Sequence, residues 1–258
     1  MTKRLGMTTR SRDVRTFDSL AALSEAAADE IVRFARESVS ARGRFSVALA
    51  GGNTPRATYE LLATRHRDAI DWQHTLVVFG DERFVPADDP RSNYRMARVA
   101  LLSRVPIPSV SILAVPTDAP TVDDAARRYD ATLKQALRHQ SPAATVDLAL
   151  LGVGPDGHTA SLFPGVPALL DRAHWALPVA APTAVQPAVP RVTTTLPFLD
   201  GARTVMFLVA GKDKQPVMRE ILSDAESASR YPAALVASPG RMLWMIDRSA
   251  MPDDRSNA

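Results

Sequence analysis

The chain has 258 residues, a formal net charge of +3 and no cysteine. The lack of cysteine excludes disulfides and thiolate metal sites. The modest charge, with arginines scattered along the chain, argues against nucleic-acid binding. No run approaches the roughly 20 apolar residues of a membrane span, and no apolar segment follows the basic N-terminus as it would in a signal peptide. We therefore expect a cytoplasmic protein.

Apolar runs alternate with amphipathic helical patterns along the chain, which is typical of α/β proteins. The elements that we expect in the first half are helix 20–40, strand 45–50, helix 56–64, strand 75–79, helix 92–102, strand 110–114 and helix 121–138. Those expected in the second half are strand 146–151, strand 175–179, a β-branched run at 191–197, strand 204–210, helix 212–222 and strands 233–236 and 242–246. Pro178 indicates an edge position for the strand at 175–179.

These elements predict a Rossmann-like α/β fold, with an open, mostly parallel sheet and helices on both faces. We expect residues 16–248 to form a single domain, because no linker separates two units. Residues 1–15 and 249–258 are expected to be disordered, since both segments are polar or basic.

One stretch combines a predicted buried strand with two side chains that can act as an acid or a base. Residues 146–164 read VDLALLGVGPDGHTASLFP, an apolar strand and then a glycine-rich turn that carries Asp156 and His158. Glycines permit positive φ and a close approach by a ligand, and open α/β sheets bind ligands at the carboxyl ends of their strands. Such a turn alone is weak evidence, because Asp-Gly is a common turn dipeptide.

A second expected strand runs into a loop of small residues. Gly51, Gly52, Asn53 and Thr54 lie between this strand and a helix, an arrangement that binds oxyanions through free backbone N–H groups. A plain tight turn is the alternative. The loop is neither a Walker A motif nor G-x-G-x-x-G, so a bound dinucleotide is not expected.

Further charged residues follow or open other expected strands. Asp81 and Arg83 come after the strand at 75–79. The planar guanidinium of Arg83 suits phosphate, and a solvated turn with an Asp–Arg pair is the alternative. Lys214 stands at a helix start, where a cation opposes the helix dipole and is more easily explained as an anion ligand. Arg191 opens the β-branched run.

The carboxyl ends of parallel strands share one edge of a sheet, so these loops can converge into one crevice. The crevice would hold an oxyanion cradle, basic side chains and a carboxylate–imidazole pair. The sequence has no G-x-S-x-G elbow and no local pair of metal-binding histidines, so neither a serine nucleophile nor a metal is expected. This inventory predicts histidine-assisted attack by water on a phosphorylated small molecule.

Five stretches resemble, in the same order, the motifs of the 6-phosphogluconolactonases, in the glucosamine/galactosamine-6-phosphate isomerase superfamily. They are AGGNTPRATYELL (50–62), FGDERFVPADDPRSNYRMA (79–97), LLGVGPDGHTASLFPG (150–165), RVTTTLP (191–197) and GKDK (211–214). The resemblance implies a fold similar to glucosamine-6-phosphate deaminase and ribose-5-phosphate isomerase. It also implies hydrolysis of 6-phospho-D-glucono-1,5-lactone to 6-phospho-D-gluconate, a step of the oxidative pentose phosphate pathway, without a cofactor.

The expected roles follow from this resemblance and from the chemistry of each side chain. His158 is expected to act as general base toward water, oriented by Asp156. Backbone N–H groups at Gly51 and Gly52 are expected to hold the developing oxyanion. The remaining expected substrate or phosphate ligands are Asn53, Thr54, Asp81, Arg83, Arg191 and Lys214.

Two other functions stay open. The deaminase relatives carry a glutamate before the proline that corresponds to Pro164, and Phe163 occupies that position here. This difference favours lactone hydrolysis over isomerisation with deamination. A non-catalytic sugar-phosphate sensor of the same fold would carry an N-terminal helix-turn-helix, and too few residues precede the first expected helix. We expect a monomer whose partner is the phosphorylated sugar lactone, with no nucleic acid and no membrane.

Overall fold

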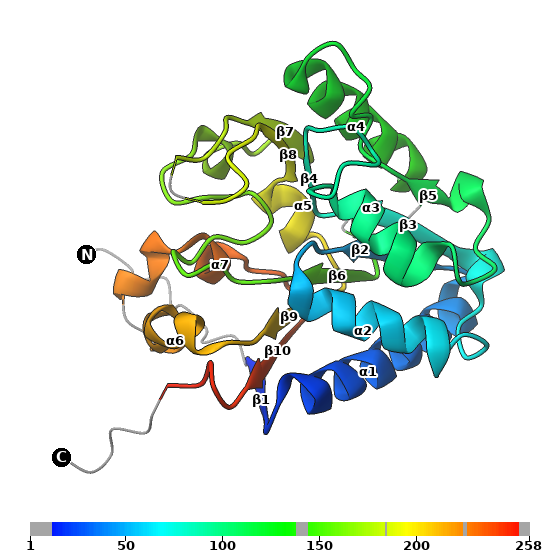
Figure 1. The fold of residues 1–258 in the computed structure, drawn as a ribbon, viewed down its shortest axis with the longest axis horizontal. Helices are drawn as coiled ribbons and strands as arrows, with labels where there is room; N and C mark the ends of the chain where they lie inside the picture. The colour runs from blue at the N-terminus through cyan, green and yellow to red at the C-terminus, as the bar shows by residue number, and fades with distance from the viewer. Residues whose placement is uncertain (1–11, 138–143, 184, 224–225, 253–258) are drawn as a thin grey trace, which may run out of the picture.

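A computed structural model describes residues 12–137, 144–183, 185–223 and 226–252. Its main sheet has seven strands in the order β1-β10-β9-β6-β2-β3-β5, and all its paired neighbours are parallel (Figure 1). The strands are β1 (Asp13–Phe17), β2 (Phe45–Leu49), β3 (Thr75–Phe79), β5 (Ile112–Leu113), β6 (Leu148–Leu151), β9 (Thr204–Val209) and β10 (Arg241–Asp247). The expected α/β fold with a mostly parallel sheet is confirmed.

A second, antiparallel sheet of three strands has the order β4-β8-β7. Its strands are β4 (Asp81–Arg83), β7 (Ala176–Val179) and β8 (Arg191–Thr194). Only Gly80 separates β4 from β3, and its carbonyl accepts a 2.8 Å hydrogen bond from the backbone N–H of Thr194. Pro178 lies in the edge strand β7, as expected.

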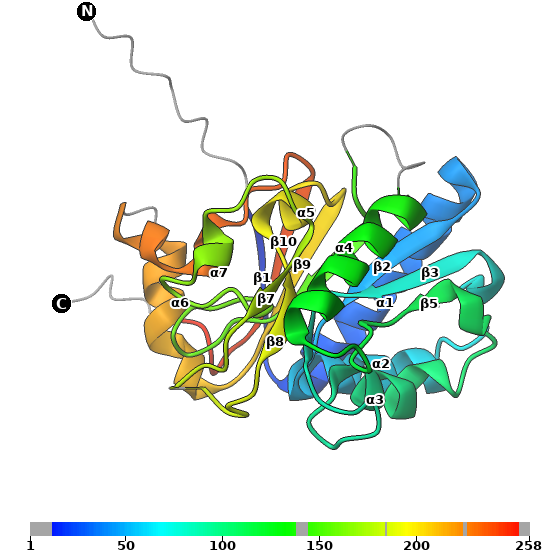
Figure 2. The same ribbon diagram turned by 90° about the horizontal axis from the view of Figure 1, so that it is seen from above.

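Helices cover both faces of the main sheet. Figure 1 and Figure 2 show α1 (Leu20–Arg42) and α2 (Asn53–Thr64) on one face, with α4 (Val122–Leu137), α5 (Leu196–Asp200) and the small sheet on the other. The remaining helical segments are α3 (Asn93–Ala97), α6 (Gln215–Leu222), α7 (Pro232–Leu235), the π-helix η2 (Arg98–Leu102) and the 3-10 helices η1 (Trp72–His74), η3 (Ser109–Ser111), η4 (Pro167–Leu169), η5 (Lys212–Lys214) and η6 (Glu226–Arg230). Within the described ranges, no helix is long and apolar enough to cross a membrane.

The sequence explains why the central elements form. Every residue of β2, β6 and β9 is buried, as expected for parallel strands that are covered on both faces. Helix α1 begins where the Ser19 side chain accepts a hydrogen bond from the backbone N–H of Ala22. It ends at Gly43, whose φ of 73° is the left-handed conformation that favours glycine.

Both ends of the ordered domain lie outside the expected limits of 16 and 248. Residues 13–15, expected to be disordered, belong to β1, which pairs with β10 at the edge of the sheet. The tail expected at 249–258 begins with ordered residues, since Ala250 is fully buried and its N–H donates to the Asp247 carboxylate at 2.9 Å. The expectations for residues 1–11 and 253–258 lie outside the described part of the chain.

One expected strand is wrong. Residues 233–236 belong mainly to the short helix α7 (Pro232–Leu235), and Pro232 in the first turn favours a helix start. The backbone N–H of Ala233 donates to the carbonyl of Gly157 at 3.0 Å. Helix α7 therefore packs against the glycine-rich turn, and the strand expected at residues 233–236 does not form.

A buried carboxylate joins the small sheet to α3. The Glu82 side chain accepts hydrogen bonds from the backbone N–H groups of Arg83, Asn93 and Tyr94, each at 2.7 Å. The hydroxyl of Ser92 donates to it at 3.1 Å. Burial raises the pKa of Glu82 to about 6, although these backbone hydrogen bonds act in the opposite direction.

This raised pKa makes a pH-dependent contribution to stability. The folded state holds the Glu82 proton more tightly than the unfolded chain does, so the contribution is complete below about pH 4.5 and is lost as the pH rises through about 6. We predict that the unfolding free energy of the wild type, minus that of Glu82→Gln, falls by about 1–2 kcal/mol between these limits. Urea unfolding at a series of pH values measures this difference.

The exposed Glu37 on α1, changed to Gln, is the control for loss of a surface carboxylate. A difference between wild type and Glu82→Gln that stays constant or rises with pH would contradict the assignment.

Candidate active site

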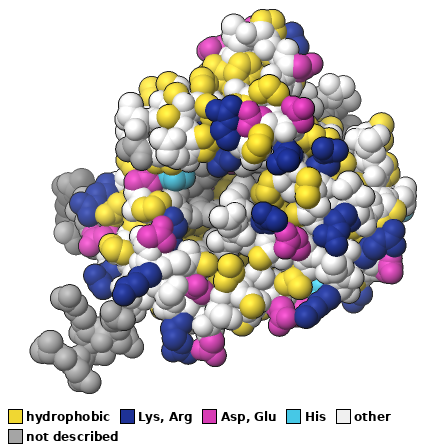
Figure 3. All heavy atoms as spheres, in the orientation of Figure 1, with side chains coloured by type: hydrophobic (Ala, Val, Ile, Leu, Met, Phe, Trp, Pro, Cys, Tyr) yellow, Lys and Arg dark blue, Asp and Glu magenta, His cyan; other side chains and the backbone are white. Residues whose placement is uncertain are grey.

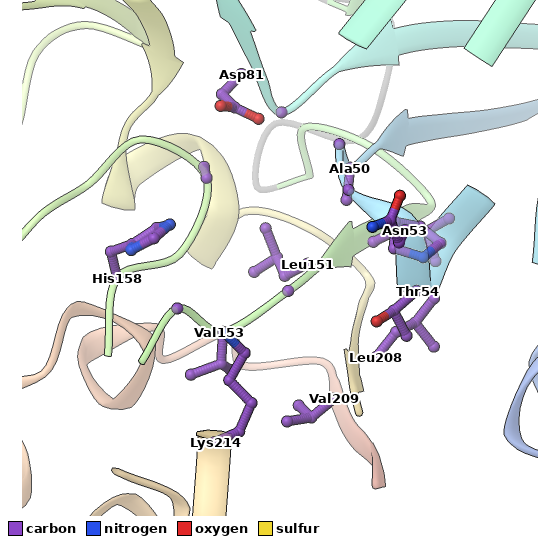
Figure 4. A pocket seen from close by; sticks show the side chains of 18 of the residues that line it. Ala50, Asn53, Thr54, Asp81, Leu151, Val153, His158, Leu208, Val209 and Lys214 are labelled. Atoms are coloured by element: carbon purple, nitrogen blue, oxygen red, sulfur yellow. The ribbon is translucent and has the colours of Figure 1, made fainter. Parts of the chain in front are cut away.

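A cavity of about 460 Å³ lies at the carboxyl ends of β2, β3, β6 and β9 (Figure 4). Nine of the ten expected site residues line this cavity, His158 among them. The tenth, Asp156, does not line it but contacts His158. The other expected residues that line the cavity are Gly51, Gly52, Asn53, Thr54, Asp81, Arg83, Arg191 and Lys214. The loops thus converge at one edge of the sheet, as parallel strands require; the role of each residue remains a prediction.

The glycine-rich turn after β6 brings a carboxylate and an imidazole together. His158 Nδ1 and Asp156 Oδ1 lie 2.5 Å apart, and the backbone N–H of His158 donates to the same oxygen at 3.2 Å. A Cβ at Gly154 would lie 2.1 Å from His158 Nδ1, so only glycine leaves room for the ring. Gly157 has a φ of 78° and packs against Tyr231, which leaves no space for a side chain.

The contact between Asp156 and His158 lowers the pKa of Asp156 and decides which ring nitrogen of His158 can meet a ligand. Burial raises the pKa of Asp156, but the hydrogen bond and charge of His158 outweigh it, so the pKa lies below its ordinary value. Asp156 is therefore a carboxylate at neutral pH. Because Nδ1 faces this carboxylate, Nε2 is the ring nitrogen left for a ligand. Figure 4 shows the His158 ring directed into the cavity.

Two arginines face each other across the small sheet. Arg83 in β4 is the register partner of Arg191 in β8, so the solvated turn that was the alternative for Asp81 and Arg83 does not form. Arg191 is only 2% exposed, and burial lowers its pKa. The Nε–H groups of both arginines are buried and have no hydrogen-bond partner among the described residues. Like charges placed opposite each other are unfavourable, and one carboxylate, Asp81, interacts with Arg191 to offset part of this charge, so this wall is suited to an anionic or hydroxyl-rich ligand.

The wall formed by α2 and η5 is also suited to anions. Gly52, with a φ of 103°, precedes α2, and no side chain in the described part of the chain caps the first N–H groups of that helix. Lys214 is 18% exposed, and its Nζ lies 2.9 Å from Asp213 Oδ2. Figure 4 shows Asn53, Thr54 and Lys214 around the lower part of the cavity, across from Asp81. The free N–H groups and the ammonium together favour a bound oxyanion.

Two residues beside the cavity, Asn93 and Ser161, were not expected from the sequence, and a third, Phe163, was noted there only as a difference from the deaminases. Asn93 and Ser161 both donate hydrogen bonds to the Asp81 carboxylate, at 3.0 and 2.7 Å. The ring centroids of Phe163 and His158 lie 4.6 Å apart. The guanidinium carbon of Arg191 lies 5.2 Å from the same Phe163 centroid. Sequence spacing carries no signal for Asn93 or Ser161, because both reach Asp81 from distant segments.

Two other surface properties bear on possible ligands. Within the described ranges, no three His, Asp or Glu side chains are grouped so that they could hold a metal ion. On the face shown in Figure 3, basic and acidic side chains are interspersed, and no continuous basic stripe is visible. This face therefore lacks the concentrated positive charge typical of nucleic-acid binding.

Comparison with known proteins identifies the family. A family model described as glucosamine-6-phosphate isomerases/6-phosphogluconolactonase matches residues 18–244. The 6-phosphogluconolactonase of Synechocystis sp. is 41% identical over 219 residues, which are 83% of this chain and 86% of that protein. The 6-phosphogluconolactonase of Homo sapiens is 39% identical over 213 residues, with 81% of each chain covered.

Solved structures agree with this result. The 6-phosphogluconolactonase from Trypanosoma brucei matches with a TM-score of 0.80 and 30% identity, and the match covers 93% of this chain and 97% of that one. The fold is shared by a monomeric glucosamine-6-phosphate deaminase, with a TM-score of 0.77, 23% identity and coverage of 92% and 98%. The chain belongs to the 6-phosphogluconolactonase family, within the wider group that also contains the glucosamine-6-phosphate isomerases.

Proposed function

We propose that this protein is a 6-phosphogluconolactonase, which hydrolyses 6-phospho-D-glucono-1,5-lactone to 6-phospho-D-gluconate. The observation that carries the proposal is the Asp156–His158 pair at 2.5 Å, with the imidazole directed into a cavity lined by basic side chains and free N–H groups. The relatives' name supports the same substrate.

In this proposal His158 Nε2 takes a proton from a water molecule that attacks the lactone carbonyl carbon C1. The carboxylate of Asp156 holds Nδ1 and stabilises the imidazolium that forms. The tetrahedral intermediate then collapses, the bond from C1 to the ring oxygen breaks, and His158 returns its proton to that oxygen. The products are a C1 carboxylic acid, which ionises in water, and the C5 hydroxyl.

Charge that develops on the carbonyl oxygen needs hydrogen-bond donors. The N–H groups around Gly51 and Gly52 are our candidates, because they lie at the uncapped start of α2 beside the cavity. A lactone is an activated ester, so modest stabilisation is enough. We infer that neither a metal nor a cofactor takes part.

We assign recognition of the 6-phosphate to Arg83 and Lys214, with Arg191 as a further candidate. All three line the cavity, and Arg83 and Arg191 have Nε–H groups without a partner among the described residues. Asn53, Thr54 and Asp81 remain for the sugar hydroxyls. Arg83 and Lys214 belong to different walls of the cavity, so substituting each one separately shows which of them contacts the phosphate.

The alternative activity, deamination with isomerisation, is less well supported. Phe163 packs on the His158 ring where the deaminase relatives carry a glutamate, so the apolar ring supplies no carboxylate for a proton relay. A sensor without catalysis would not need the Asp156–His158 pair. A cytoplasmic location and a monomeric state remain predictions.

We predict that His158→Ala lowers kcat for the phosphorylated lactone by about 100-fold or more, because general-base catalysis contributes roughly 10²–10⁴. Turnover is measured by coupled oxidation of the product, at a pH where spontaneous hydrolysis is slow, and circular dichroism reports folding. His174→Ala is the matched control, since it removes an exposed His–Asp pair of 2.9 Å that lies outside the cavity lining. A folded His158→Ala variant with near wild-type kcat would exclude the general-base role.

We predict that Arg83→Ala and Lys214→Ala raise KM for the phosphorylated lactone by roughly 10- to 100-fold, the cost of one charge-assisted hydrogen bond. Their effect on the unphosphorylated lactone should be much smaller. Lys212→Ala is the control, because this exposed lysine belongs to the same short helix as Lys214 but does not line the cavity. Equal effects on both lactones would remove the substituted residue from the phosphate site.

A further inference from the structure

A buried chain of hydrogen bonds runs from α3 through Asp81 to the segment after the glycine-rich turn. The side-chain amide of Asn93 donates from Nδ2 to the Asp81 carbonyl and to Asp81 Oδ1, each at 3.0 Å. Ser161 Oγ donates to the other carboxylate oxygen, Oδ2, at 2.7 Å. The three residues are 2%, 6% and 0% exposed. The Asp81 carboxylate is thus held at both oxygens while it still lines the cavity.

The same asparagine contacts the loop of small residues after β2. A Cβ at Gly51 would lie 2.1 Å from Asn93 Oδ1, so the loop backbone approaches the amide more closely than any side chain would allow. The backbone N–H of Asn93 donates to Glu82 at 2.7 Å, which fixes the residue at the start of α3. Asn93 is therefore the junction between Gly51 and Asp81.

We propose that Asn93 is a positioning residue of the active site. Its amide orients the Asp81 carboxylate toward the substrate and sets the distance between that carboxylate and the Gly51 backbone. An amide suits this position because its nitrogen, Nδ2, donates to the Asp81 carboxylate while its oxygen, Oδ1, packs against Gly51. The inference rests on the proposed function, since Asp81 and Gly51 are among the groups assigned to the substrate.

Charged and titratable groups around Asp81 set the background for a pH test. Glu82 adjoins Asp81 on β4, and its pKa is about 6. Among the described residues, Tyr59, Tyr129 and Arg191 also interact electrostatically with Asp81. Arg83, the register partner of Arg191, adds a further cation. These groups are present in every variant, so the informative quantity is the ratio of variant to wild type at each pH.

The test replaces the donor by a carboxyl group of the same shape. In Asn93→Asp two carboxyl groups face each other at the 3.0 Å separation now spanned by the amide. They cannot both ionise without strong repulsion. At low pH the shared proton restores a hydrogen bond to Asp81, and at high pH the two groups repel. We expect kcat/KM of Asn93→Asp, relative to wild type, to fall at least about tenfold between about pH 5.5 and about pH 8.

Two further variants separate positioning from a general loss of stability. Asn93→Ala should lower kcat/KM by roughly 10- to 100-fold with the pH profile of the wild type, because no carboxyl group is added. Ser92→Ala is the matched control: it removes a buried hydrogen bond donated to Glu82 and a half-buried one accepted from the N–H of Arg95, but none to Asp81. It should lower the melting temperature and leave kcat/KM near that of the wild type.

The outcomes distinguish this inference from the proposed function. If the wild type hydrolyses the lactone and the ratio for Asn93→Asp does not change with pH, the inference is wrong and the function stands. If the wild type does not hydrolyse the lactone, the function is wrong, and urea unfolding then tests only the contact between Asn93 and Asp81. The stability of Asn93→Asp relative to wild type must decrease as the pH rises through the same range; a constant difference overturns the proposal.

Discussion

The parallel pairing of β2, β3, β6 and β9 is the constraint on which the site depends. Because these strands run in one direction, their carboxyl ends lie at one edge, and the four following loops must share that space. The small sheet adds a wall: β4 begins one residue after β3 and pairs with β8, which places Arg83 opposite Arg191. Polar and charged side chains from Asn53 to Lys214 thereby line one cavity.

Glycines and buried polar contacts convert this arrangement into defined geometry. Gly154 leaves space for the His158 ring, and Gly51 leaves space for the Asn93 amide. Hydrogen bonds then hold these side chains in place. Asp156 contacts the His158 ring, and the Asp81 carboxylate accepts from both Asn93 and Ser161. A site of this kind is preorganised, so little reorganisation is needed when charge develops during the reaction.

The sequence was sufficient for features that local patterns encode. The fully buried strands appear as apolar runs, and the residues at their ends could be assigned to one edge from strand direction alone. Edge strand β1 has only five residues, two of them charged and none of them buried, so it resembled a polar terminus. The hydrogen bonds of Asn93 and Ser161 join positions 12 and 80 residues from Asp81 along the chain. Such contacts depend on tertiary packing, and no periodicity in the sequence reports them.

The central claim is that the reacting carbon of the substrate lies at His158. A crystal structure with the product 6-phospho-D-gluconate bound tests it most directly. We predict a C1 carboxylate oxygen within hydrogen-bond distance of His158 Nε2, with the phosphate on basic side chains away from the Asp156–His158 pair. A product bound with its phosphate against His158, or outside the cavity, would contradict it.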